Sequence, residues 1–346
     1  MPLAFITGAG GFIGGYTVRE FVQRGWHVIA LIHRKTSPEL EELTRSGEVT
    51  ILRGNLDAFA DLDAGLRRAV DSKGVPLDAV VHCAGRASDV GRREEFRRAN
   101  LESVRNLGQL AMEMGARRFV FVSTTDVYGL RDFNAETEDQ LPLANNTGNP
   151  YPEFKIRAER WITETLPPDR YSIIRPAAVW GVGDPTLTPR VVSFLRSSPW
   201  IVHFGKWRGR NRWPLAHVRN VSSAIFLAAT LDQAAGSPIN VLDSEVTSMD
   251  EFYRAVASVY LPDKKFRRLV LPMWLGKAFG AVVSGVSNTL NLDHPFTDPS
   301  RYALSSVSCN LDFSNAAMLR LFEAAGIVPV TRDEGVRELQ ASQGHM

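Results

Sequence analysis

The sequence is poor in cysteine. Its 346 residues include two, Cys83 and Cys309, which lie far apart and form no Cys-x-x-Cys pair. This scarcity argues against a disulfide framework and a thiolate metal site, and it makes a reducing cytoplasm the expected location. The seven histidines show neither a His-Glu-x-x-His motif nor a short paired spacing, so we expect no metal.

The chain also lacks an excess of charge of either sign and a long uninterrupted apolar run. Its formal net charge is +2, so its overall charge does not indicate nucleic acid or an anionic membrane as a partner. No basic region precedes an apolar core at the N-terminus, and charges interrupt the long apolar stretches, so we expect neither a signal peptide nor a spanning helix. The most apolar segment, 269–290, contains Pro272, Lys277 and three glycines. It fits an amphipathic helix beside an apolar pocket and a plain core helix equally well.

Short apolar runs that alternate with helical patterns are abundant. Apolar residues make up 44% of the chain, which is enough for a substantial core. The runs predict strands at 3–7, 26–32, 49–53, 78–82, 118–123, 171–175 and 238–242. The patterns between them predict helices at 12–24, 38–45, 59–70, 91–114, after Tyr151 and at 218–231. The alternation is typical of an α/β Rossmann fold, a doubly wound parallel sheet with helices on both faces.

The alternation loosens after Pro176, where prolines and glycines become frequent between 181 and 214. We therefore predict a dinucleotide-binding domain formed by 1–180 and about 215–242. The remaining residues, 181–214 and 243–346, are predicted to form a smaller, discontinuous, mostly helical substrate-binding lobe.

The first predicted strand runs directly into TGAGGFIG, residues 7–14. Gly8 permits a tight turn, Gly11 lets backbone approach the phosphates, and Gly14 lets the helix lie close on the sheet. The helix that opens at Phe12 and Ile13 presents free N–H groups to an anion. This arrangement predicts a site for the pyrophosphate of a dinucleotide.

The end of the second predicted strand indicates which dinucleotide binds. An acidic residue there usually binds the adenosine ribose and selects NAD. This chain instead has His33, Arg34 and Lys35, whose cations could neutralise a 2′-phosphate, so we expect NADP in preference to NAD. After the third strand, Asn55 could bond the adenine edge and Leu56 could line its face; Asn55 could equally serve as a capping residue.

Tyr151 and Lys155 are the candidate catalytic pair, because a spacing of four places both on one helical face. Thr124 lies at the end of the fifth strand, where a doubly wound sheet binds its ligand. Hydride transfer to a ketone creates an alkoxide that needs a proton. A phenol has a pKa of about 10, and a nearby lysine cation favours the phenolate that the reverse reaction needs. Thr124 would position the substrate oxygen.

Taken together, these motifs resemble the extended short-chain dehydrogenase/reductase, or NAD-dependent epimerase/dehydratase, family. The resemblance covers TGAGGFIG, HCAG (82–85), Asn100, VSTTDVYG (122–129), the Tyr151–Lys155 pair and RPAAVWG (175–181). It implies that Tyr151 is the acid/base, that Lys155 also binds the nicotinamide ribose, and that the segment after Arg175 meets the nicotinamide. The other cofactor-binding positions that it implies are Ala84, Gly85, Asn100, Pro176 and Val179. Homodimers through 91–114 and 152–165 are common in the family.

Within the family, YPEFKIRAE (151–159) is most similar to the 3β-hydroxysteroid and sterol dehydrogenase branch, with related bacterial β-keto acid reductases. We therefore expect a secondary alcohol or ketone substrate that is hydrophobic or amphiphilic. A basic loop, defined as residues 205–213, carries Lys206, Arg208, Arg210 and Arg212, which could meet an anionic group on that substrate.

Two other functions remain open from the sequence. A nucleotide-sugar epimerase or dehydratase with tightly bound NAD(P) would also use cations such as those of the basic loop. However, Trp213 stands where such enzymes usually have an arginine. A non-enzymatic NADP sensor is the other alternative, and the intact Thr124, Tyr151 and Lys155 set argues against it.

Overall fold

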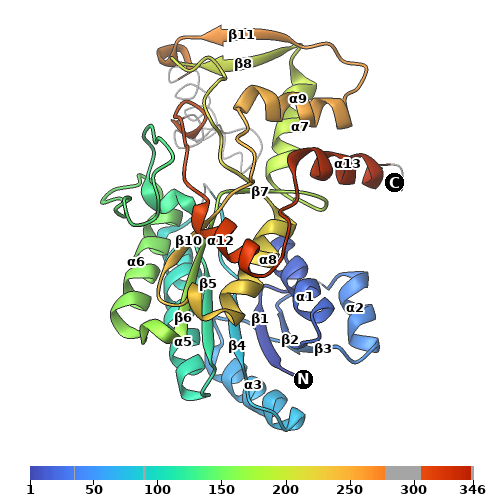
Figure 1. The fold of residues 1–346 in the computed structure, drawn as a ribbon, viewed down its shortest axis with the longest axis vertical. Coiled ribbons are helices and arrows are strands. Elements are labelled where there is room, and N and C mark those ends of the chain that lie inside the picture. Colours follow the sequence, from blue (N-terminus) through green and yellow to red (C-terminus); the bar gives the residue numbers. More distant parts are fainter. Residues whose placement is uncertain (35, 89–90, 277–304, 344–346) are drawn as a thin grey trace.

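The computed structural model describes residues 1–34, 36–88, 91–276 and 305–343. A seven-stranded parallel sheet lies at its centre, in the order β10-β6-β5-β4-β1-β2-β3 (Figure 1). The strands are β1 (Leu3–Thr7), β2 (His27–Ile32), β3 (Val49–Arg53), β4 (Ala79–His82), β5 (Arg118–Val122), β6 (Tyr171–Pro176) and β10 (Pro238–Val241). The sheet confirms the predicted doubly wound α/β fold.

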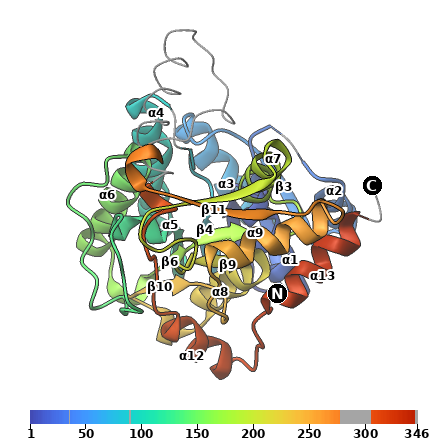
Figure 2. The ribbon, with the colours of Figure 1, turned by 90° about the horizontal axis from the view of Figure 1, so that it is seen from above.

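Helices cover both faces of the sheet. Successive residues of a strand point to opposite faces, and here both faces carry apolar side chains that the helices bury. In β1, Ala4 and Ile6 join one core cluster, whereas Leu3 and Phe5 join the other (Figure 2 shows the layers from above). The first cluster lies under α1 (Phe12–Gln23), α2 (Pro38–Arg45), α8 (Val218–Thr230) and α12 (Ala316–Ala324). The second lies under α3 (Phe59–Lys73), α4 (Arg93–Arg97), α5 (Ser103–Glu113) and α6 (Pro150–Thr165).

The strand order reverses between β1 and β4, which are neighbours in the sheet although two strands separate them along the chain. Loops that leave the carboxyl ends of these strands run in opposite directions, and the crevice between them is where open α/β sheets bind ligands. The glycine turn follows β1 and Ala84 follows β4, so both belong to this crevice.

A second group of elements lies above the carboxyl ends of the sheet in Figure 1. It contains two small parallel sheets, one of β7 (Ala178–Trp180) with β9 (Leu215–His217) and one of β8 (Trp200–Phe204) with β11 (Arg267–Leu271). Its helices are α7 (Leu187–Ser197), α9 (Met249–Tyr260) and α13 (Arg332–Gln343). Trp180, Ile201 and Phe252 belong to its separate core cluster. The exact division of the chain into two units stays a prediction.

Two predicted helices differ from the structure. The predicted 91–114 helix is interrupted by η1 (Arg98–Glu102), a π-helical turn between α4 and α5. In the apolar segment 269–290, Leu269–Leu271 instead belong to β11, which pairs in register with Val202–Phe204 of β8, whereas residues 273–276 are helical. The part of this segment from residue 277 lies outside the described residues. Among the described helices, none combines the length and apolarity that crossing a bilayer requires.

Candidate functional site

The glycine turn has the backbone geometry of an anion cradle. Gly8 has a φ of +68°, and a Cβ there would lie 2.8 Å from the Ala84 nitrogen; a Cβ on Gly14 would lie 2.1 Å from the Gly8 oxygen. Gly11, the N-cap of α1, meets only the Gly8 oxygen, and the first helical turn has no acidic side chain. The first turn of α1, which has no side-chain cap and no acidic residue, and the missing side chain at Gly11 therefore fit the pyrophosphate of a dinucleotide.

The buried His82 links the start of the glycine turn to α5. Thr7 Oγ1 lies 2.7 Å from His82 Nδ1, and His82 Nε2 lies 3.1 Å from Ser103 Oγ. Since the Ser103 hydroxyl donates to the Ala99 oxygen, His82 Nε2 must donate to Ser103, and the Thr7 hydroxyl donates to Nδ1. Burial and, to a smaller extent, the charge of Lys155 together lower the pKa of His82 to about 3. His82 is thus a neutral structural bridge whose two ring nitrogens both take part in hydrogen bonds.

The π-helical turn η1 directs Asn100 toward the loop after β4. Asn100 Oδ1 accepts a 2.9 Å hydrogen bond from the Arg86 nitrogen, and Asn100 Nδ2 donates to the Arg86 oxygen at 3.0 Å. A Cβ on Gly85 would lie 2.8 Å from Asn100 Oδ1 and 3.4 Å from Lys155 Nζ. The structure therefore brings together Gly85, Asn100 and Lys155, three of the predicted site residues. A single extra residue in a helix is a common device at functional sites.

Lys155 is the buried cation of the site. The residue is 4% exposed, and Nζ donates a 2.7 Å hydrogen bond to the Val122 oxygen. The ammonium also lies 4.6 Å from the centroid of the Phe121 ring. Burial lowers the pKa of Lys155 to about 8, whereas the negative charge of Glu159 opposes this shift.

Tyr151 and Thr124 come from neighbouring elements. Tyr151 lies in the first turn of α6, where its backbone N–H donates a 2.9 Å hydrogen bond to the side chain of the N-cap residue Asn149. Thr124 caps the 3₁₀ turn η2 (Thr125–Tyr128), and its hydroxyl oxygen accepts the Asp126 N–H at 3.2 Å. The Thr124 hydroxyl keeps its own proton for a further bond. Helix α6 packs against η2, which directs both residues to the same end of the sheet.

A buried ion pair that we did not predict from the sequence joins α6 to β6. Glu159 Oε1 and Oε2 accept hydrogen bonds from Arg175 Nε at 3.1 Å and Nη2 at 2.5 Å. Arg175 Nη1 also donates a 2.7 Å hydrogen bond to the Tyr128 hydroxyl. The Tyr128 hydroxyl in turn donates a 2.8 Å hydrogen bond to Asn240 Oδ1. A carboxylate one helical turn after Lys155, on the same face, was the available sequence signal.

The residues predicted for the adenosine end are at the surface. His33 and Arg34 are exposed just after β2, and Lys35 lies outside the described residues. Asn55 Oδ1 accepts the Asp57 N–H at 3.1 Å, so this side chain caps its own turn, and its adenine contact stays a prediction. Leu56 packs at the edge of the core under α3. For the nicotinamide end, Pro176 closes β6 and the half-buried Val179 lies in β7.

The four cations of the basic loop have different environments. Lys206 Nζ lies 2.5 Å from Asp132 Oδ2, and Arg212 pairs with Asp312. Arg208 and Arg210 are exposed, and within the described ranges neither is found in an ion pair. Trp207 Nε1 also donates to Asp132 Oδ1 at 2.9 Å, which fixes the loop against the segment that follows η2.

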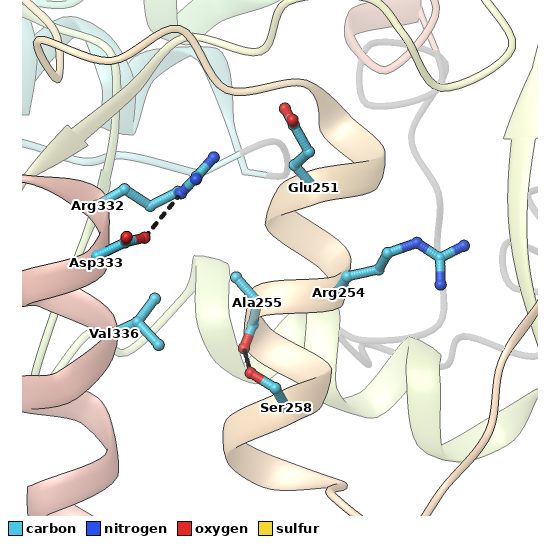
Figure 3. A pocket seen from close by; sticks show the side chains of 7 residues that line it. All are labelled: Glu251, Arg254, Ala255, Ser258, Arg332, Asp333 and Val336. Carbon is cyan, nitrogen blue, oxygen red and sulfur yellow. Dashed lines mark hydrogen bonds and ion pairs between the residues drawn. The ribbon is translucent and has the colours of Figure 1, made fainter.

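A hollow of about 310 Å³ between α9 and α13 is not part of this site. It is lined by Glu251, Arg254, Ala255, Ser258, Arg332, Asp333 and Val336, none of which is a predicted site residue (Figure 3). Arg254 pairs with Asp250 and Arg332 pairs with Asp333, so its charges are satisfied locally. In the described part of the chain, no group of three His, Cys, Asp or Glu side chains is arranged for a metal.

Two proteins of known activity are similar to this chain in sequence. One is the 2-alkyl-3-oxoalkanoate reductase of Stenotrophomonas maltophilia, which is 29% identical over 64% of this chain and 64% of that protein. The other is human sterol-4-alpha-carboxylate 3-dehydrogenase, decarboxylating, which is 27% identical over 65% of this chain and 56% of that protein. Each match therefore spans less than two thirds of the relative's length.

A similar fold occurs in the crystal structure of dTDP-glucose 4,6-dehydratase from Bacillus anthracis in complex with NAD. The TM-score is 0.70 at 17% identity, over 100% of this chain and 97% of that one. The model of the NAD dependent epimerase/dehydratase family matches residues 4–241, which include the glycine turn, Thr124, Tyr151 and Lys155. The chain belongs to the NAD dependent epimerase/dehydratase family, the family that its motifs predict.

Proposed function

We propose that this protein is an NADP-preferring oxidoreductase that interconverts a secondary alcohol and a ketone on a hydrophobic or amphiphilic substrate. The observation that carries the proposal is the placement of Lys155. Its buried ammonium lies one helical turn from Tyr151, beside Gly85 and Asn100, and donates to the strand end that precedes Thr124. A buried lysine beside a tyrosine at the switch point of a dinucleotide fold is suited to proton transfer.

The bound nicotinamide would supply or accept the hydride. In the ketone-reducing direction, Tyr151 gives a proton to the alkoxide that forms, and in the reverse direction its phenolate takes that proton. The Lys155 ammonium stabilises negative charge on the phenol oxygen, and burial strengthens this effect because water screens it less. Thr124 can donate its hydroxyl proton to the substrate oxygen and hold it for transfer.

The cofactor preference is supported by the charges at the end of β2. The exposed Arg34 and His33 offer donors for a 2′-phosphate, and no carboxylate occupies the position that would bind the ribose hydroxyls of NAD. The glycine turn itself fits the pyrophosphate of either dinucleotide. The preference for NADP therefore depends on the β2 end alone.

The substrate class is supported by the relatives and by the basic loop. The reductase relative is named for a 3-oxoalkanoate, a ketone with a carboxylate beside an alkyl chain. The exposed Arg208 and Arg210 would suit such a carboxylate, whereas Lys206 and Arg212 are already paired. We propose an acyl or sterol-like ketone that carries an anionic group.

A nucleotide-sugar epimerase or dehydratase is the second candidate, and its support is the fold shared with the dTDP-glucose dehydratase. One feature of the lobe opposes it. Trp213, at the position where such enzymes usually have an arginine, packs its ring edge-on against Phe252 at 5.6 Å and Tyr253 at 6.0 Å. This side chain belongs to the lobe core and offers no charge to a diphosphate.

A cofactor-release and turnover experiment separates the two candidates. The purified protein is denatured to measure any bound dinucleotide, and NADPH oxidation is then followed with 3-oxoalkanoates, steroid ketones and UDP-glucose. If the protein is a reductase, we expect the purified protein to retain little dinucleotide and to consume NADPH stoichiometrically with at least one ketone. Retained NAD(P) together with interconversion of a nucleotide sugar would favour the second candidate.

A further inference from the structure

Glu159 and Arg175 form an ion pair that is almost completely buried. Their side chains are 2% and 6% exposed, and the contact is bidentate, with both Glu159 oxygens bound by the guanidinium. Desolvating two charges is costly, and a buried pair is a poor source of stability compared with apolar packing. Its position therefore calls for an explanation beyond stability.

The ion pair connects the catalytic helix to the loop that carries Thr124. Glu159 lies on α6, one turn after Lys155, and Arg175 lies on β6. Arg175 Nη1 donates to the hydroxyl of Tyr128, the last residue of η2, and Tyr128 donates to Asn240 on β10. One continuous set of hydrogen bonds thus joins α6, β6, η2 and β10.

We propose that Glu159 is a positioning residue that holds a negative charge one helical turn from the Lys155 ammonium and, through Arg175 and Tyr128, fixes α6 against the Thr124 loop. The inference rests on the proposed function, since it gives Lys155 its role beside Tyr151. Glu159 itself does not touch the substrate. Its carboxylate acts by its charge, which lies one turn from the lysine, and by its two bonds to Arg175.

The charges around Lys155 show why one carboxylate matters. His82, the last residue of β4, and Cys83, which follows it, both interact with the lysine charge, and burial keeps both neutral at pH 7, with a pKa of about 3 for His82 and about 12 for Cys83. From α6, Glu159 raises the pKa of Lys155 against the lowering by burial. Beyond Glu159 lie the Arg175 cation and the Tyr128 hydroxyl, whose pKa burial raises to about 12.

Arg175 limits how strongly Glu159 acts on the lysine. The Arg175 guanidinium, on β6, binds both oxygens of the Glu159 carboxylate, while the Lys155 ammonium is bound to the Val122 oxygen. Lys155 therefore keeps a positive charge that is not cancelled by direct pairing and can act on Tyr151. Removal of Glu159 or of Arg175 should consequently change the Lys155 pKa in opposite directions.

The test uses the variants E159Q and R175Q in the full chain. Ketone reduction should fall as pH rises and Lys155 loses its proton, which defines an alkaline limb of kcat. We expect E159Q to move this limb down by about one pH unit, and R175Q to move it up, since the unpaired carboxylate then acts on Lys155 alone. The KM for NADPH should change less than about threefold. The exposed Glu164, near the end of α6, provides the matched control variant E164Q.

A direct measurement of Lys155 separates failure of this inference from failure of the proposed function. The chain has seven lysines, so ¹³Cε-lysine labelling and the variant K155M assign the Lys155 signal in a pH titration. Shifts of opposite sign in the two variants support the inference even if no ketone is reduced. Equal or absent shifts overturn it, whatever the activity.

If neither single variant folds, the double variant E159Q/R175Q leaves no unpaired buried charge. We then expect the Lys155 pKa and the alkaline limb to lie within about half a pH unit of wild type, because the two removed charges have opposite effects. We also expect a lower kcat, because the link from α6 to η2 is lost. An unchanged kcat, or a larger displacement of the titration, overturns it.

Discussion

The Lys155 ammonium donates to the carbonyl oxygen of Val122 at 2.7 Å, and Val122 is the last residue of β5. This bond attaches α6 to the sheet immediately before the segment that carries Thr124. Because Tyr151 lies one helical turn before Lys155, the same bond also fixes where the phenol can lie. The contact therefore joins the packing of α6 to the proposed proton transfer, and it sets the expectations for the variants below.

Replacement of Tyr151 by phenylalanine should remove the proton donor and leave the fold intact. We expect kcat for ketone reduction to fall by about 10²- to 10⁴-fold, the usual range for general acid–base catalysis. The Kd for NADPH, measured by fluorescence, should change little, because the glycine turn is untouched. Y260F, in α9 of the lobe, serves as the control. Normal turnover by Y151F would refute the catalytic assignment.

Glycines 14 and 15 offer a matched pair at the start of α1. A Cβ on Gly14 would lie 2.1 Å from the Gly8 oxygen, which is backbone and cannot move aside, whereas a Cβ on Gly15 would lie 3.5 Å from the Ala9 oxygen. We therefore expect G14A to lose NADPH binding and to unfold at a lower temperature. G15A should bind normally. Equal binding by both variants in calorimetric titration would show that the turn is not the phosphate site.

Local patterns predicted the features that depend on a few adjacent residues. The Gly8–Gly14 turn, the seven strands of the sheet and the one-turn spacing of Tyr151 and Lys155 all follow from short-range spacing, and the structure has them. The Glu159–Arg175 ion pair could not be predicted, because α6 and β6 supply one partner each and the sequence does not show which buried charges meet. The π-helical turn around Asn100 was missed for a related reason, since a one-residue insertion leaves the apolar helical period almost unchanged.

The cofactor preference can be tested at the end of β2. Alanine at both Arg34 and Lys35 removes the two permanent cations that the sequence places after β2, where the 2′-phosphate of NADP is expected. Since a hydrogen bond to a charged group contributes about 1.5–3 kcal/mol, we expect the KM for NADPH to rise at least tenfold and that for NADH to change little. R45A, at the exposed last turn of α2, is the charge control. Equal effects on both cofactors would remove the preference for NADP.

His82 should make the fold sensitive to acid. Its pKa is about 3 when buried and about 6.5 in an unfolded chain, so the unfolded state binds the extra proton between these values and stability falls as pH decreases from 6.5 toward 3. At pH 5 the difference amounts to about 2 kcal/mol. Urea unfolding of H82Q should therefore lose about 2 kcal/mol less than wild type between pH 7 and pH 5. H33Q makes the same substitution at an exposed position outside the bridge and serves as the control. An unchanged slope for H82Q would contradict the neutral bridge.

The basic loop supplies the sharpest test of the substrate class. Arg208 and Arg210 are exposed on either side of Gly209, and the loop is fixed at its start by Lys206 and Trp207 on Asp132. If these two arginines meet a carboxylate, the double variant R208Q/R210Q should raise the KM for a 3-oxo acid at least tenfold. The KM for its neutral methyl ester should stay within about threefold of wild type, as should both values for the exposed α12 variant R320Q. The ester isolates the charge of the substrate from its shape, so a parallel loss with acid and ester would assign the loop to folding of the lobe instead of to recognition of an anion.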